Sequence, residues 1–159
     1  MTQVVVTLRK LEASVGNAFT ALSTRFSEHP GFRGPNGSGG FFFVAPTDDG
    51  ALPLLVVPVG EIDGNQIGSS ATWAQTLAGR LTLRYPREFA VQGEEEHGNA
   101  LCVFPYILAF SGLSATTAAA LLMRTALDAG IIEKPEARER LEAFLSGRRD
   151  AGTDVWTII

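Results

Sequence analysis

The stretch Leu101–Gly130, LCVFPYILAFSGLSATTAAALLMRTALDAG, carries the clearest structural pattern in the chain. Its part from Tyr106 to Phe110 is continuously apolar and too short to span a bilayer, which favours a strand that is buried on at least one face. Ser111 and Gly112 follow directly, and glycine tolerates the positive φ that a sharp turn needs. We therefore expect a buried strand that ends in a tight turn.

A buried helix is predicted after this turn. Ser114 is placed to accept a backbone N–H as the N-cap, and Gly130 is placed to close the helix in the left-handed conformation. Between them, residues 115–129 are apolar or small apart from Arg124 and Asp128. A helix that is apolar all round is buried in a core or at a subunit interface. The pattern predicts architecture rather than chemistry.

The composition excludes several classes of protein. The 159 residues are enough for one domain with a substantial core. The 13 basic and 17 acidic residues give a net charge of -4 without a basic stripe, so we expect no nucleic-acid partner. We find neither a membrane span nor a signal peptide and expect a cytoplasmic protein without a membrane partner. The single cysteine, Cys102, excludes an internal disulfide and is expected to be buried.

The N-terminal part predicts a helix followed by a hairpin. Apolar residues recur every three or four positions from Thr7 to Glu28, with Thr7 as a plausible N-cap. Residues 4–6 are read either as a short strand or as the entry to this helix. Asp49-Gly50 separates the apolar runs 41–45 and 52–59, which predicts an antiparallel hairpin. Pro53 and Pro58 cannot donate to a ladder and are expected at strand ends or on an edge.

The remaining segments complete an α+β pattern. We expect a helix capped by Ser69 or Ser70 that reaches about Arg84, a short strand at 89–91, and a C-terminal helix from about Pro135 whose charged residues face water. The apolar tail at 154–159 is expected to dock on its own domain or on a neighbouring subunit. This order predicts an antiparallel sheet with packed helices, of the profilin-like kind, over residues 1–132, with residues 133–159 as an additional C-terminal helix and tail.

Part of the sequence resembles a known family. Residues 107–114, ILAFSGLS, followed by a helix of small residues, resemble the closing strand and helix of the GlcG/HbpS-like family of haem-binding or haem-degrading proteins, which includes the C-terminal domain of PduO-type proteins. Residues 87–93, REFAVQG, are similar to the segment before that strand in one branch, and Trp73 lies where that branch places a tryptophan. The resemblance spans roughly residues 4–132 and implies a homo-oligomer that binds a small organic ligand, with haem as the first candidate.

The candidate binding residues follow from side-chain chemistry. A haem iron would take an axial ligand from a small set, namely His29, His97, Cys102, Met123 and Tyr106. Trp73 could form an aromatic wall, and Arg80 with Arg84, on adjacent helical turns, could bind a carboxylate or propionate, although a core tryptophan and surface ion pairs are the simpler interpretations. A divalent cation could be held by Glu94, Glu96 and His97, although a solvated acidic turn is simpler.

Three functional classes remain open from the sequence. The first is an oligomeric binding protein for a small ligand or cofactor, with its pocket between the hairpin, the middle helix and a neighbouring subunit. The second is a cyclase- or isomerase-like enzyme that uses an apolar pocket and polar groups such as Arg80, Glu88 or His97. The third is an interaction module without a pocket. No nucleophile constellation and no phosphate-binding glycine motif points elsewhere.

Overall fold

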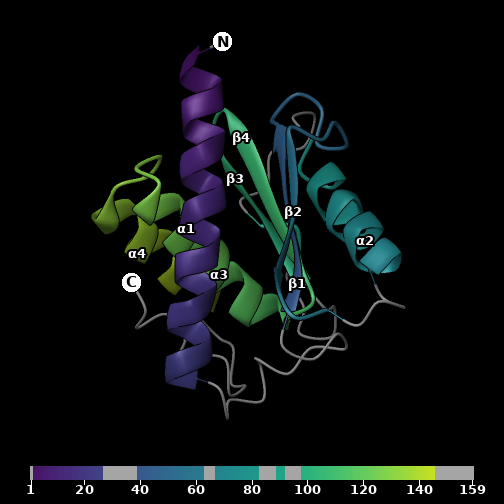
Figure 1. The fold of residues 1–159 in the computed structure, drawn as a ribbon. Helices are drawn as coiled ribbons and strands as arrows, with labels where there is room; N and C mark the ends of the chain where they lie inside the picture. The colour runs from purple at the N-terminus through teal and green to yellow at the C-terminus, as the bar shows by residue number, and fades with distance from the viewer. Residues whose placement is uncertain (1, 27–38, 63–66, 83–88, 92–97, 146–159) are drawn as a thin grey trace.

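The computed structural model describes residues 2–26, 39–62, 67–82, 89–91 and 98–145. The helices and strands of these residues follow one another in the order α1 (Thr2–Phe26), β1 (Gly39–Pro46), β2 (Leu55–Gly60), α2 (Ile67–Gly79), β3 (Gly98–Val103), β4 (Tyr106–Ser111), α3 (Ala115–Asp128) and α4 (Lys134–Leu145). This confirms the predicted α+β class (Figure 1). The finer profilin-like assignment stays a prediction.

The four strands form an antiparallel sheet in the order β2-β1-β4-β3. The two predicted hairpin strands pair with Phe43 opposite Val56, and β1 pairs on its other side with Phe43 opposite Ala109. The hairpin prediction is confirmed. Pro58 lies in β2, an edge strand of the described sheet, where a missing N–H does not interrupt an inner ladder.

Both faces of the sheet are covered by helices. Helices α1 and α3 lie on one face and α2 lies on the other (Figure 1). Along β1, Phe42 and Val44 join the core under α1 and α3, while Phe41 and Phe43 join the core under α2. Side chains alternate between the faces of a strand, so a strand buried on both faces reads as a continuous apolar run. This explains why β1 and β4 show no polar alternation.

Helix α3 has the predicted caps. The Ser114 side chain accepts from the Thr117 N–H at 3.3 Å. At the other end Gly130 has φ +77°, and its N–H and that of Ile131 donate to the carbonyls of Leu127 and Ala126 at 3.1 Å each. These two bonds form a Schellman motif. The all-round apolar character of α3 follows from its position, since the sheet, α1 and α4 all pack against it.

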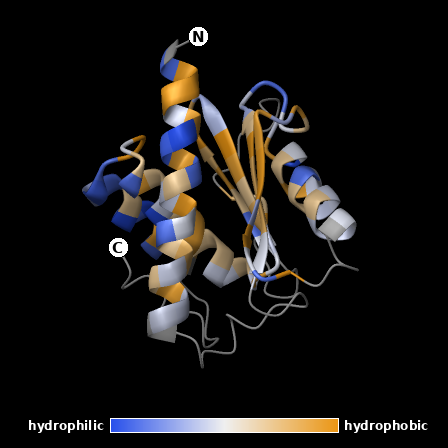
Figure 2. Cartoon of the chain, in the orientation of Figure 1, coloured by the Kyte–Doolittle hydropathy of each residue, from blue (hydrophilic) through white to orange (hydrophobic). Residues whose placement is uncertain are grey.

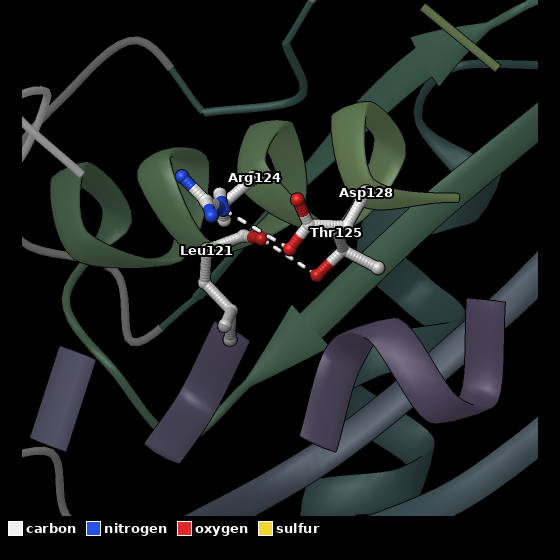
Figure 3. Close-up of polar contacts among 4 residues, drawn as sticks. All are labelled: Leu121, Arg124, Thr125 and Asp128. Atoms are coloured by element: carbon white, nitrogen blue, oxygen red, sulfur yellow. Dashed lines mark hydrogen bonds and ion pairs between the residues drawn. The ribbon is translucent and has the colours of Figure 1, made fainter. Parts of the chain in front are cut away.

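Two polar side-chain contacts of α3 lie within the helix itself (Figure 3). Arg124 pairs with Asp128 one turn later at 3.0 Å, and both side chains are about one-third exposed. Thr125 is buried and donates its hydroxyl hydrogen to the Leu121 carbonyl at 2.7 Å. Because the Thr125 hydroxyl finds its acceptor one turn away in the same helix, this polar side chain can be buried at little cost.

Two predicted helix starts are wrong. Helix α1 begins at Thr2, so residues 4–6 belong to the helix and Thr7 is an interior residue whose hydroxyl donates to the Gln3 carbonyl. Helix α2 begins at Ile67, before Ser69 and Ser70, and ends at Gly79 rather than near Arg84. In both cases the helix begins before a residue of a type that often caps helices. A residue that can cap a helix can also lie inside it when the residues before it form helix hydrogen bonds.

The central stretch contains two strands rather than one. Strands β3 and β4 are joined by the two-residue turn Phe104-Pro105, whose peptide bond is cis. Cys102 lies in β3 and is half-buried rather than buried. The predicted short strand at 89–91 contributes an isolated bridge between Phe89 and Leu101. An Xaa-Pro pair inside an apolar run was therefore the signal for a turn.

Helix α4 packs beside α3 and the 89–91 segment. Leu141 and Phe144 are buried as predicted, and the Phe144 ring stacks on Phe89 with 4.4 Å between ring centroids. Arg140 was predicted to face water but is half-buried, and its guanidinium donates to the Cys102 carbonyl. The glycines and prolines of residues 31–40 predict a loop, and this prediction is wrong for Gly39 and Gly40, which belong to β1. The rest of that predicted loop and the predicted tail at 154–159 lie outside the described residues. Among the helices of the described ranges, none combines the length and apolarity needed to cross a bilayer.

Candidate functional site

The structure brings two of the predicted binding residues together. The Arg80 guanidinium carbon lies 5.4 Å from the centroid of the Trp73 ring, which is cation–π geometry. Trp73 is half-buried and Arg80 is exposed, on and just after α2. The other predicted residues lie outside the described residues, namely His29, Arg84, Glu94, Glu96 and His97. The described residues contain no group of three or more His, Cys, Asp or Glu side chains that could hold a metal ion.

A hollow of about 490 Å³ lies between the start of α1 and the β3–β4 turn. Its walls come from three elements and are mainly apolar, and they consist of Gln3, Val4, Thr7, Phe104, Pro105, Tyr106 and Ile131. We call it the Tyr106 hollow. Ligand pockets typically enclose about 300–1,000 Å³ and combine apolar walls with a few polar groups. The Tyr106 hollow has a volume in this range, apolar walls and a few polar side chains, and it is open to solvent on one side.

The fold explains why these residues meet. Tyr106 is the first residue of β4 and pairs with Val103, so its side chain enters the core under α1. The two-residue turn before it leaves Phe104 79% exposed at the rim. Val4 continues the inner stripe of α1, but it is 39% exposed because α1 extends past the end of the sheet. The hollow is therefore the space between an overhanging helix and a tight turn.

Tyr106 brings a hydroxyl without a described protein partner to this site. The residue is only 7% exposed, and no hydrogen bond joins its hydroxyl to another residue within the described ranges. A bound molecule that supplies a donor or acceptor at this position gains one hydrogen bond in place of a bond to water, which contributes about 0.5–1.5 kcal/mol net.

The electrostatic character of the hollow is neutral. None of its described lining residues is an acid or a base at neutral pH, and the Thr7 hydroxyl already donates to the Gln3 carbonyl at 2.9 Å. The polar groups left for a ligand are the Tyr106 hydroxyl and the Gln3 side-chain amide. Such a lining favours a neutral, largely apolar molecule with one or two hydrogen-bonding atoms.

A second hollow of about 490 Å³ runs between α1 and the edge strand β2. It is lined by apolar residues, by the carboxylate of Glu12, and by the hydroxyls of Thr20 and Ser23. Both hydroxyls donate to carbonyls of their own helix, Thr20 to Gly16 at 3.0 Å and Ser23 to Thr20 at 3.1 Å. No buried group without a partner marks this groove among its described residues, so it is the weaker candidate.

The described pair of Trp73 and Arg80 lies on the other face of the sheet from the Tyr106 hollow. Trp73 belongs to the core cluster under α2, whereas Tyr106 belongs to the cluster under α1 and α3. Of the five predicted axial-ligand candidates, Tyr106 lines the hollow, Met123 is fully buried in α3, and Cys102 is half-buried in β3. The sequence named Tyr106 only as one member of that set. The signal that could have singled it out is its place directly after a Phe-Pro turn.

Comparison of the chain with protein-family models, with curated proteins and with solved structures gives no match.

Proposed function

We propose that this chain is a homo-oligomeric binding protein for a small, largely apolar organic molecule, which it holds in the Tyr106 hollow. The observation that carries the proposal is the hydroxyl of the buried residue Tyr106, which has no partner among the described residues. Folding places this group at an open hollow and leaves its hydrogen-bonding capacity unused. That arrangement is typical of a site whose partner is a ligand.

Haem is the ligand that the resemblance to the GlcG/HbpS-like family implies. A tyrosine oxygen can serve as an axial haem ligand, and Tyr106 is the candidate for that role at the hollow. The propionates of haem find no cationic side chain among the described lining residues, since Arg80 lies with Trp73 on the α2 side. The described lining therefore favours a neutral ligand over haem, and the two can be compared directly.

The test uses Tyr106→Phe, which removes the hydroxyl and keeps the ring. We expect the wild-type protein to bind the neutral dye Nile red with saturation, and Tyr106→Phe to bind it about 2- to 10-fold more weakly, because one net hydrogen bond contributes about 0.5–1.5 kcal/mol. The same titration with ferric haem, followed at the Soret band, tests the family-derived ligand. A Soret shift lost in Tyr106→Phe would assign haem to this site.

The matched control is Thr20→Val, which removes a hydroxyl from the α1–β2 groove. We expect it to leave dye binding unchanged, since the Thr20 hydroxyl already donates to the Gly16 carbonyl. A second readout is the thermal unfolding of Tyr106→Phe without ligand. We expect no loss of stability, because the hydroxyl has no described partner to lose. Equal dye binding by wild type and Tyr106→Phe, or weaker binding only in Thr20→Val, would refute the assignment.

A second candidate function is that of an interaction module. It is favoured by the exposed apolar side chains of the first turns of α1 and of the β3–β4 turn. A flat response to both dye and haem, combined with a defined assembly mass, would support this alternative.

A further inference from the structure

Exposed large apolar side chains gather at one end of the molecule. Among the described residues six such side chains are at least 39% exposed, and five of them belong to three segments that meet at one end of the sheet: Val4, Val5, Val6, Leu52 and Phe104. We call these five residues the apolar end. Figure 2 shows the start of α1 in orange at this end, above a blue segment of the same helix. Exposed apolar side chains gathered at one end of a molecule mark a candidate interaction site.

The β1–β2 loop and the start of α1 both adjoin the β3–β4 turn. The Thr47 N–H, in the β1–β2 loop, donates to the Pro105 carbonyl in the β3–β4 turn at 3.2 Å. Val4, in the first turns of α1, lines the same hollow as Phe104. The apolar end is therefore continuous with the Tyr106 hollow, whose open side it borders.

Charges of opposite sign lie on the two sides of the apolar end. Arg9 and Lys10 are exposed on α1, which covers one face of the sheet. Asp48 and Asp49 are exposed in the β1–β2 loop. The same loop is tied to the α2 side, because the Gly50 N–H donates to Thr82 at 3.0 Å and Gln75 donates to the Ala51 carbonyl at 2.6 Å. No ion pair within the described part of the chain uses Arg9, Lys10, Asp48 or Asp49.

This distribution is self-complementary under a two-fold rotation. An apolar centre with cations on one side and anions on the other places each positive patch opposite the negative patch of an identical molecule. We infer that the partner of the apolar end is a second copy of this chain, related by a two-fold axis near Phe104. The second copy would also cover the open side of the Tyr106 hollow. The inference rests on the proposed function, since it names the interface of the homo-oligomer proposed there.

The first experiment measures the mass of the protein by light scattering over a range of concentrations. We expect a dimer for the wild type and a dissociation constant raised about 30-fold in Phe104→Ser, because a central aromatic anchor commonly contributes about 2 kcal/mol to an interface. The control is Val56→Ser, which removes the sixth exposed apolar side chain, on the edge strand β2, and should leave the mass unchanged. A monomeric wild type, or a dimer that Phe104→Ser leaves intact, overturns the inference.

The second experiment reverses the charges and does not touch the hollow. Arg9→Glu combined with Lys10→Glu should weaken the dimer, since acidic patches would then face each other. Adding Asp48→Lys and Asp49→Lys to the same chain should restore it, because the signs are opposite again. A dimer that neither charge change affects overturns the two-fold arrangement. If a charge-reversed monomer still binds the dye, and Tyr106→Phe weakens that binding, the ligand site exists independently of the dimer interface.

Discussion

Asn99 is a fully buried polar residue of β3 whose replacement should destabilise the protein strongly. It is 0% exposed in β3, and its side-chain oxygen accepts from the N–H groups of Val91 at 2.9 Å and of Ala100 at 2.8 Å. Its side-chain nitrogen donates to the Ala115 carbonyl at 3.2 Å. One amide thus connects β3 with the 89–91 segment and with the first turn of α3.

The cost of Asn99→Ala follows from the groups left behind. Ala100 presents its backbone toward the 89–91 segment, since its carbonyl accepts from the Ala90 N–H at 3.0 Å, so its own N–H has no ladder partner in β4. The change therefore removes the acceptor of two buried N–H groups, those of Val91 and Ala100. At about 1–3 kcal/mol for each, the expected loss is about 2–6 kcal/mol in the free energy of unfolding.

The measurement is urea unfolding followed by circular dichroism, with thermal unfolding as a second readout. A loss near 4 kcal/mol is a large part of the roughly 5–15 kcal/mol typical of a domain and should lower Tm by about 10 °C. The matched control is Asn17→Ala, the same substitution at an exposed position of α1, which should change stability by no more than about 0.5 kcal/mol. If Asn99→Ala unfolds at the same urea concentration as Asn17→Ala, the reasoning from unsatisfied buried groups is refuted.

Two backbone predictions use the same assay. Gly112 has φ +118°, and an added Cβ would lie 2.4 Å from the Gly39 carbonyl oxygen, so Gly112→Ala should destabilise the protein by more than about 1 kcal/mol. At Gly16 an added Cβ would meet nothing within 4 Å, so Gly16→Ala should stabilise α1 by about 0.5–1 kcal/mol. The opposite order would contradict the geometry. Ser114→Ala removes the N-cap of α3 and should cost about 1 kcal/mol, and a change below a few tenths would show that this cap contributes little.

Local pattern was sufficient where a structural element depends on its own residues. The hairpin at Asp49-Gly50, the Ser114 cap, the Gly130 left-handed residue and the α+β class were predicted correctly because turn chemistry and hydrophobic periodicity act over a few positions. The same reasoning failed at Thr7, which is a good capping residue in isolation. There the helix begins at Thr2, five residues earlier. A capping side chain is only one of several partners that can satisfy the backbone N–H groups of a first turn.

The candidate site depended on contacts between distant parts of the chain. Gln3, Phe104 and Tyr106 become neighbours only because α1 overhangs the sheet beside the β3–β4 turn, and no spacing in the sequence records that overhang. The same holds for the unused Tyr106 hydroxyl, since a partner is present or absent only once all surrounding elements are packed. The sequence by itself determined the α+β class, the hairpin and the caps of α3, but not the separate strand β3 or the first residues of α1 and α2. The tertiary structure alone decided where apolar side chains and a buried hydroxyl remain uncovered, because burial is set by what packs against a residue and not by the residue itself.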